Sequence, residues 1–170
     1  MLNRAHATLV AGCDFVSQRQ WEVSHARTLP CPWTQGVHNR LLANYLRELD
    51  RFLCVLLEEA ALSLGGPDHD ARRFARLRKT SDKLKLVEHM IGMPSRHDAR
   101  LGAIRRIATR LRRPGTICQP SHAKDISLAC DVSLETPLAL QSIARFYRDL
   151  GDDLMKALHK VGKDILYPMG

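Results

Sequence analysis

Apolar side chains recur every three or four positions along most of this chain, which is the spacing of an α-helix. The clearest early run lies within residues 37–64 and ends at Gly65-Gly66-Pro67, a combination that stops a helix. A second run covers residues 137–165 and follows Thr136-Pro137, a good N-cap and first-turn pair. We predict that both runs are long helices of the core.

The last of these runs contains Gly151 and Gly162 among good helix formers. A glycine inside a helix costs about 1 kcal/mol relative to alanine. We therefore expect a neighbouring element to approach closely at both glycines.

The N-terminal part of the chain predicts a less regular arrangement. Residues 2–27 fit one or two helices with mixed faces. The segment with Pro30, Pro32 and Trp33 is expected to be a loop of about ten residues, because proline interrupts a helix.

The middle of the chain predicts shorter helices. Residues 70–79 form a basic helical segment, and Ser81 is placed to cap a helix that ends at Gly92. Ser95, with Asp98 three residues later, resembles a capping box and begins a helix that Pro114-Gly115 ends.

Residues 116–135 lack helical periodicity, and Ile126-Ser127-Leu128 and Val132-Ser133-Leu134 alternate as in a small hairpin or an extended loop. The expected fold is all-α, a bundle of five or six helices with a small β-hairpin between the last two. A length of 170 residues suits a single domain, residues 1–170.

Composition agrees with a helical fold, since Leu, Ala and Arg are abundant and aromatic residues make up only 5%. The cysteines are odd in number and irregularly spaced, which favours a reducing compartment: Cys13, Cys31, Cys54, Cys118 and Cys130. The apolar stretches are too short for a signal peptide or a membrane span, so we expect a cytoplasmic protein without a membrane partner.

Charge is distributed very unevenly along the chain. Residues 71–113 hold fourteen Lys and Arg against three acids, whereas the whole chain has a net charge of +8. Clustered cations favour a polyanionic partner, because neutralising phosphates releases their condensed counterions.

The helix expected over residues 95–113 has two different faces. Leu101, Ile104, Ile107, Ala108 and Leu111 share one side. The other side carries the residues that we expect to bind nucleic acid, Arg105, Arg106, Arg110, Arg112 and Arg113, with Arg72, Arg73, Lys79 and Lys83 extending the field. Acids are scarce nearby, so we expect these guanidiniums to be unmatched by carboxylates.

The order of these elements resembles HEPN domains: a long helix, a glycine turn, the short helix with Asp82-Lys83-Leu84-Lys85-Leu86-Val87-Glu88, and then Ile104-Arg105-Arg106-Ile107 before Pro114-Gly115. HEPN domains are small helical domains of RNases, toxins and nucleotidyltransferase partners in prokaryotic defence. The resemblance covers about residues 37–115, and it implies a HEPN-like core over 37–165.

Members of that family commonly carry an Arg-Asn-x-x-x-His motif and cut RNA as dimers. Here Ala108, Thr109 and Arg113 occupy the positions of the family's Arg, Asn and His. Without that histidine the motif has no evident general acid or base. The resemblance implies RNA binding by a homodimer in a defence or regulatory system, without catalysis; an enzyme of this type would be a ribonuclease.

Three other interpretations stay open. The chain fits a protein-interaction module whose basic surface meets an acidic partner and whose last helix forms a homodimer seam. It also fits an RNase that uses Arg19 and His25, which have a spacing tolerated by the family. Residues 81–113 could form a DNA-reading helix-turn-helix, although Gly92-Met93-Pro94 suits its tight turn poorly.

Metal and cofactor motifs are not evident. Potential zinc ligands are present at Cys31, His38, Cys118, His122 and Cys130, but their spacing is irregular, and we expect no metal. No GxSxG, Gly-Lys-Ser/Thr or GxGxxG sequence occurs, so no cofactor is expected.

Overall fold

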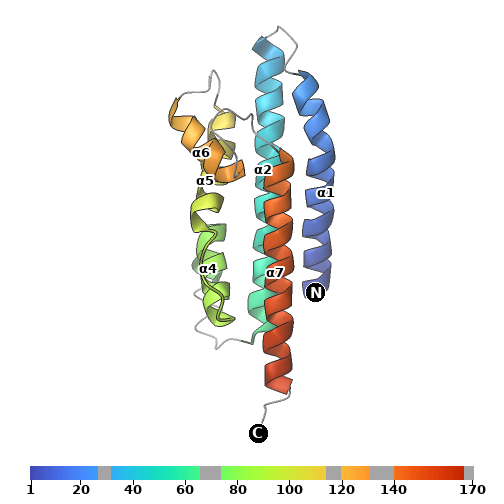
Figure 1. Cartoon of the computed structure of the whole chain (residues 1–170), viewed down its shortest axis with the longest axis vertical. Coiled ribbons are helices and arrows are strands. Elements are labelled where there is room, and N and C mark those ends of the chain that lie inside the picture. Colours follow the sequence, from blue (N-terminus) through green and yellow to red (C-terminus); the bar gives the residue numbers. More distant parts are fainter. Residues whose placement is uncertain (27–31, 66–73, 114–119, 131–139, 167–170) are drawn as a thin grey trace.

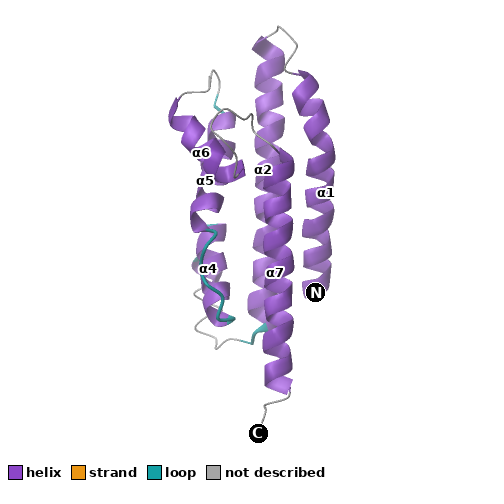
Figure 2. Ribbon diagram, viewed as in Figure 1, coloured by secondary structure: helices purple, strands orange, loops and turns teal. Residues whose placement is uncertain are grey.

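The computed structural model describes residues 1–26, 32–65, 74–113, 120–130 and 140–166 (Figure 1). The helices that Figure 1 labels are α1 (Leu2–Ala26), α2 (Pro32–Ser63), α4 (Thr80–Met90), α5 (Asp98–Leu111), α6 (Pro120–Cys130) and α7 (Leu140–Leu166). Residues 74–76 are also helical, and no strand occurs in the described ranges (Figure 2). The all-α fold class is confirmed.

The three long helices α1, α2 and α7 run alongside one another, and α4, α5 and α6 lie together on another side of the bundle (Figure 1). Helix α2 contacts α1, α4, α5 and α7, so it joins the two groups. Its buried residues include the predicted three-four pattern: Leu42, Leu46, Leu49, Leu53, Leu56 and Ala60. The position of α2 between the two groups follows from this apolar surface.

Helix α7 packs along α1 and α2 through the stripe that its sequence predicts. The buried residues of this stripe are Leu140, Ile143, Tyr147, Leu150, Leu154 and Leu158. A stripe buried within the protomer is not available to a second copy. The idea that the last helix supplies a homodimer seam on this face is therefore wrong.

The two glycines of α7 differ in their surroundings. A Cβ atom at Gly151 would lie 2.8 Å from Leu9 Cδ2 of α1, which confirms the expected close approach. At Gly162 a Cβ atom would meet nothing within 4 Å among the described residues, so the expected close approach is not found there. Only Gly151 is explained by the packing of a neighbouring helix.

This difference predicts opposite effects for one substitution. Gly162→Ala should stabilise the protein by up to about 1 kcal/mol, since alanine favours the helix and has room. Gly151→Ala should lose that gain or destabilise the protein, because an extra methyl in a packed core costs about 1–3 kcal/mol. Urea unfolding of both variants measures the two free energies. Equal stabilisation by both would contradict the close contact at Gly151.

Helix boundaries differ from the sequence expectation in two places. Pro32 begins α2 and Trp33 continues it, so the loop expected around these residues is wrong there. Proline is favoured in the first turn of a helix, where no N–H bond is lost. Helix α4 begins at Thr80 with Lys79 as its N-cap, and Ser81 is therefore not the cap.

Two further expectations concern the segments that flank the last helix. Residues Ile126-Ser127-Leu128 belong to α6, so the first strand of the proposed hairpin is wrong. Ala129 is buried and Leu128 is exposed, as on a short helix with one face in the core. The other strand, residues 132–134, and the N-cap pair Thr136-Pro137 lie outside the described residues.

The two-faced character of α5 is confirmed. Leu101, Ala103, Ile104, Ile107 and Ala108 are buried. The N-cap position is His97, which makes no capping bond through its side chain, so the expected capping box at Ser95 and Asp98 does not form the helix start.

None of the helices among the described residues is long and apolar enough to span a bilayer.

Candidate nucleic-acid interface

The arginines of α5 differ in whether a carboxylate pairs with them. Asp125 of α6 accepts hydrogen bonds from Arg106 Nε at 3.1 Å and Nη2 at 2.8 Å. Its second oxygen accepts one from Arg110 Nη1 at 2.5 Å. The expectation that these two guanidiniums are unmatched by carboxylates is therefore wrong: the acid that matches them lies on a separate helix, which α5 packs against.

The surroundings of Asp125 favour the charged carboxylate that pairs with Arg106 and Arg110. Its side chain is only 10% exposed, and burial by itself favours the protonated form. The hydrogen bonds and charges of Arg106 and Arg110 outweigh burial and hold the pKa of Asp125 below its usual value. The carboxylate therefore joins α5 to α6 as a bridged ion pair.

Arg105 and Arg112, in contrast, are exposed and line a cleft. Arg105 lies on α5 and Arg112 is the C-cap residue of that helix, still in helical conformation. Their separation of seven residues places them on one face, about 10 Å apart along the axis. Among the described residues, neither has a carboxylate within ion-pair distance. These two are the α5 arginines that remain open to a ligand.

The other residues predicted to bind nucleic acid differ in exposure, and some lie outside the described residues. Lys79 is exposed at the N-terminus of α4, and Arg113 is exposed but already takes part in an interaction. Arg72 and Arg73 lie outside the described residues. Lys83 is the clear correction, since it is buried.

Lys83 belongs to a cluster with the half-buried Cys54 and the exposed Glu58. Its Nζ donates to Glu58 Oε1 at 2.5 Å and contacts Cys54 Sγ at 3.2 Å. Burial favours the neutral amine, but the hydrogen bonds to Glu58 and Cys54 outweigh it and raise the pKa of Lys83. Its charge is thus matched by Glu58, and Lys83 does not extend the basic surface.

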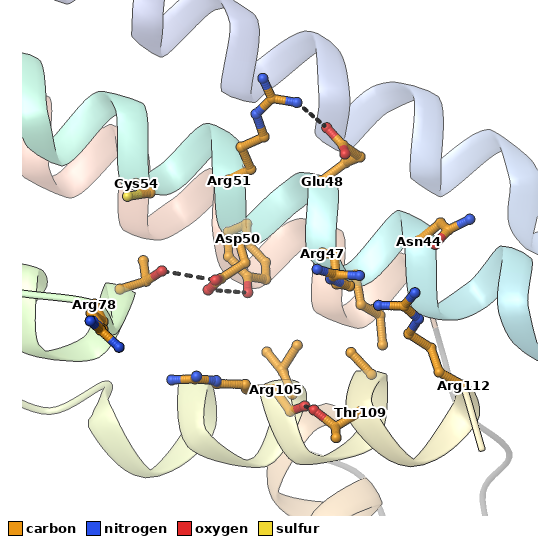
Figure 3. A pocket seen from close by; sticks show the side chains of 15 residues that line it. Asn44, Arg47, Glu48, Asp50, Arg51, Cys54, Arg78, Arg105, Thr109 and Arg112 are labelled. Atoms are coloured by element: carbon orange, nitrogen blue, oxygen red, sulfur yellow. Dashed lines mark hydrogen bonds and ion pairs between the residues drawn. The ribbon is translucent and has the colours of Figure 1, made fainter.

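The cleft lies between α2, α5 and the start of α4, and has a volume of about 980 Å³ (Figure 3). Five arginines line it. Arg105 of α5 and its C-cap residue Arg112 were expected from the sequence, and Arg47, Arg51 and Arg78 were not. The acids that line it are Glu48 and Asp50. Glu48 lies 3.7 Å from Arg51, and Figure 3 shows this pair on the side of α2 away from α5.

The remaining guanidiniums surround Asp50. Figure 3 shows Arg78 and Arg105 toward one end of the cleft and Arg47 and Arg112 toward the other, with Asp50 between them. None of these four arginines has a carboxylate within ion-pair distance among the described residues. The cleft is therefore cationic at both ends.

Asp50 is held by two neutral hydroxyls. Thr80 Oγ1 donates to Oδ2 at 2.8 Å, and Tyr147 Oη lies 3.5 Å from Oδ1. Burial raises the pKa of Asp50, although Thr80, the charge of Arg105 and Tyr147 act in the opposite direction. Tyr147 is fully buried, and this burial, with the nearby charge of Asp50, raises its pKa well above the usual value.

The sequence contains one weak signal for this site, the spacing of polar residues on α2. Arg47, Asp50, Arg51 and Cys54 recur at three and four residues on α2, so they share a face beside the apolar stripe. The prediction from the basic segment 71–113 named residues of that segment and none of α2. Nothing in the sequence pairs Arg78 or Tyr147 with this face.

Three residues were aligned with the HEPN motif by resemblance alone: Ala108, Thr109 and Arg113. Ala108 and Thr109 line the cleft, whereas Arg113 is not among the lining residues. No histidine or lysine is among the described residues that line it. Asp50 is the lining carboxyl whose pKa burial raises above its usual value.

The other candidate residues lie elsewhere. Arg19 stacks on the ring of Phe15 at 4.9 Å, and the side chain of His25 is outside the described part of the structure. The five potential zinc ligands also have side chains outside it. Within the described ranges no group of three His, Cys, Asp or Glu is arranged to hold a metal ion.

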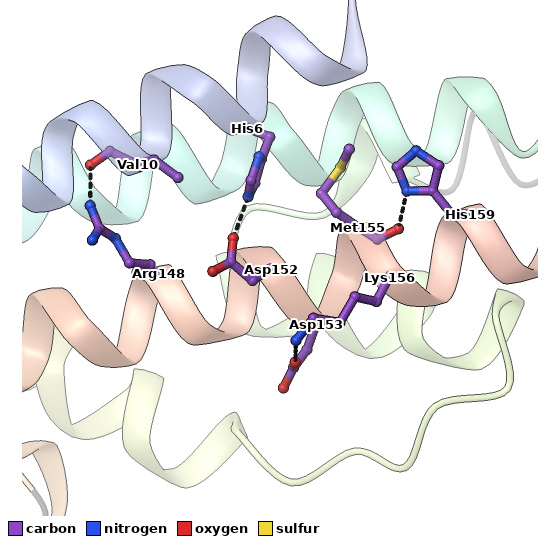
Figure 4. Close-up of polar contacts among 8 residues, drawn as sticks. All are labelled: His6, Val10, Arg148, Asp152, Asp153, Met155, Lys156 and His159. Atoms are coloured by element: carbon purple, nitrogen blue, oxygen red, sulfur yellow. Dashed lines mark hydrogen bonds and ion pairs between the residues drawn. The ribbon is translucent and has the colours of Figure 1, made fainter.

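Other polar contacts fasten the long helices to each other. His6 Nε2 lies 2.7 Å from Asp152 Oδ1, and Arg148 reaches the carbonyl of Val10 at 3.5 Å (Figure 4). These contacts join α1 to α7 on a part of the bundle separate from the cleft lining. They belong to the scaffold of the fold.

Comparison with protein-family models, with curated proteins and with solved structures found no match to this chain.

Proposed function

We propose that this chain binds RNA through its phosphates in the cleft between α2 and α5, as a HEPN-like domain that lacks the nuclease motif. The observation that supports the proposal is the convergence of Arg47, Arg78, Arg105 and Arg112 on one cleft, without a carboxylate within ion-pair distance among the described residues. A planar guanidinium donates in a fork that matches phosphate oxygens.

Binding is favoured over cleavage by the composition of the cleft. General acid–base cleavage of RNA needs one group to take a proton and another to give one. Asp50 could take a proton, but the described lining residues offer no histidine or lysine to protonate the leaving oxygen. We therefore propose a binding role, and an RNase built on Arg19 and His25 remains a separate hypothesis.

The proposal is tested by fluorescence anisotropy with labelled single-stranded RNA, double-stranded DNA and polyglutamate at several salt concentrations. We expect RNA to bind most tightly and its affinity to fall with salt by about 0.7 log units per log unit for each phosphate contacted. Polyglutamate bound as tightly as RNA would favour an acidic protein partner instead. An absence of RNA binding at low salt would refute the proposal.

We also propose that two copies associate along α2. Leu41, Val55 and Leu62 are 38%, 41% and 71% exposed, and their spacing in multiples of seven places them on one face of that helix. Glu48, paired with Arg51, takes the intervening position of this line, so the proposed seam combines these apolar side chains with that ion pair. Light scattering after gel filtration should give a dimer that Val55→Glu converts to monomer; a wild-type monomer at high concentration would refute this arrangement.

A further inference from the structure

A carboxylate in the middle of an anion-binding cleft needs an explanation. Asp50 repels phosphate, so a cleft for phosphates alone would bind better without it. Its oxygens accept from Thr80 and Tyr147, both neutral. A carboxylate offers about four acceptor sites, so two hydroxyl donors leave acceptor capacity on each oxygen. Asp50 is thus suited to a ligand that carries hydrogen-bond donors as well as negative charge.

Part of the floor of the cleft is apolar, among lining residues that are mostly charged or polar. Leu46, Ile104 and Ala108 line the cleft and are at most 4% exposed, so they form its floor. Ligand sites commonly combine such apolar walls with a few placed polar groups within about 300–1,000 Å³. A cleft of about 980 Å³ has room for a flat base and its flanking phosphates.

The cations are arranged on both sides of this floor. Arg78 and Arg105 lie toward one end and Arg47 and Arg112 toward the other (Figure 3). A nucleotide within a strand has one phosphate on each side of its sugar. The charges along the cleft run positive, negative, positive. This order is complementary to a phosphate, a base edge that donates hydrogen bonds, and a second phosphate.

We infer that Asp50 recognises a guanine base of single-stranded RNA, accepting hydrogen bonds from N1–H and from the 2-amino group, while the two arginine pairs hold the flanking phosphates. This inference rests on the proposed function. Guanine is the standard base with two adjacent donors on its Watson–Crick edge, whereas adenine and cytosine present one amino group there and uracil one N–H. Single-stranded RNA is read on such edges.

The first measurement needs no variant. Three labelled single-stranded RNAs differ only at one central base, which is guanine, hypoxanthine or adenine. Wild-type protein should bind the guanine RNA roughly ten- to hundredfold more tightly than the adenine RNA, the range for a bidentate base contact. Hypoxanthine lacks the 2-amino group and should fall between the two.

A second measurement exchanges the specificity. In Asp50→Asn one carboxylate oxygen becomes an amide that donates, and the side chain keeps its shape. Xanthine has a carbonyl in place of the 2-amino group of guanine, so it presents one donor and one acceptor. The variant should therefore lose affinity for guanosine monophosphate and gain affinity for xanthosine monophosphate, each measured as a competitor of labelled RNA. A role in the fold alone would not exchange one base for another.

The possible outcomes separate the inference from the function on which it rests. If the three RNAs bind equally while binding still depends on salt, the guanine assignment is overturned and RNA binding stands. If none of them binds, both are overturned. Equal weakening of both monophosphates by Asp50→Asn would also overturn the assignment of Asp50 to the base edge.

Discussion

Arg105→Ala combined with Arg112→Ala is expected to weaken RNA binding about a hundredfold. Both side chains are exposed, line the cleft, and have no carboxylate within ion-pair distance among the described residues. A hydrogen bond to a charged group contributes roughly 1.5 kcal/mol or more, so two such losses give this factor. Stability should change by less than about 0.5 kcal/mol, because surface substitutions of this kind are usually neutral.

The salt dependence of the same variant gives an independent measurement. Each phosphate contact that is lost should reduce the slope of log affinity against log salt by about 0.7 for a single strand. The double variant should therefore show a slope smaller by about 1.4 in anisotropy titrations. Its melting temperature, followed by circular dichroism, checks that the fold is kept.

A matched control removes the same charge elsewhere. Arg4 and Arg145 are exposed on α1 and α7 and do not line the cleft. Arg4→Ala with Arg145→Ala should reduce affinity only slightly, through the net charge of the protein. If the control and the cleft variant lose affinity equally, RNA is attracted by charge in general and the cleft is not its site.

Asp125→Ala is expected to destabilise the protein by about 2 kcal/mol. Breaking a buried ion pair by removing one partner costs about 3–5 kcal/mol. The two guanidiniums here can regain some hydration, because the side chains of Arg106 and Arg110 are 52% and 30% exposed, and this reduces the cost. For a chain of this length, the melting temperature should fall by roughly 5 °C.

The control for this variant is Asp153→Ala. Asp153 is also paired, with Lys156 at 3.1 Å, but both side chains are more than half exposed. Exposed pairs contribute about 0–1 kcal/mol, so this substitution should be nearly neutral. Arg106→Glu with Arg110→Glu would place two acids beside Asp125 and should destabilise strongly, which makes that pair unsuitable for testing RNA binding. Equal stability of both alanine variants would contradict the bridging role.

The same bridge predicts a dependence on pH. The pKa of Asp125 in the folded protein lies below its usual value of 3.8, so its stabilisation is fully present above that value. It is lost as the pH falls through the lower value of the folded state. The difference in melting temperature between wild type and Asp125→Asn should be constant from pH 7 to 5 and shrink below about pH 4. A difference that persists unchanged at low pH would mean that the charge is not involved.

Local patterns predicted the helices well where the apolar spacing is regular. The runs in 37–64 and 137–165 became α2 and α7, and the two faces of α5 were assigned correctly. The failures fell where the pattern is weak or where proline has two meanings. Pro32 begins a helix instead of interrupting one, and the alternation at 126–128 is too short to distinguish a strand from a helix.

The candidate site was predicted only in part. Arg105 and Arg112 were among the expected residues, but Arg47, Arg78 and Asp50 were not. The sequence predicts that these arginines lie on the polar face of their helix. It does not predict which other helix packs beside that face. The neighbouring helix determines whether a guanidinium pairs with a carboxylate or lines a cleft.

The sequence by itself determined the helical class, the buried stripes and the concentration of positive charge, because these depend on residues three or four positions apart. Tertiary structure alone decided that Asp125 matches Arg106 and Arg110, 19 and 15 residues away. It also placed Asp50 beside Thr80 and Tyr147, 30 and 97 residues along the chain. Contacts over such separations depend on how whole helices pack, and no local spacing encodes that packing.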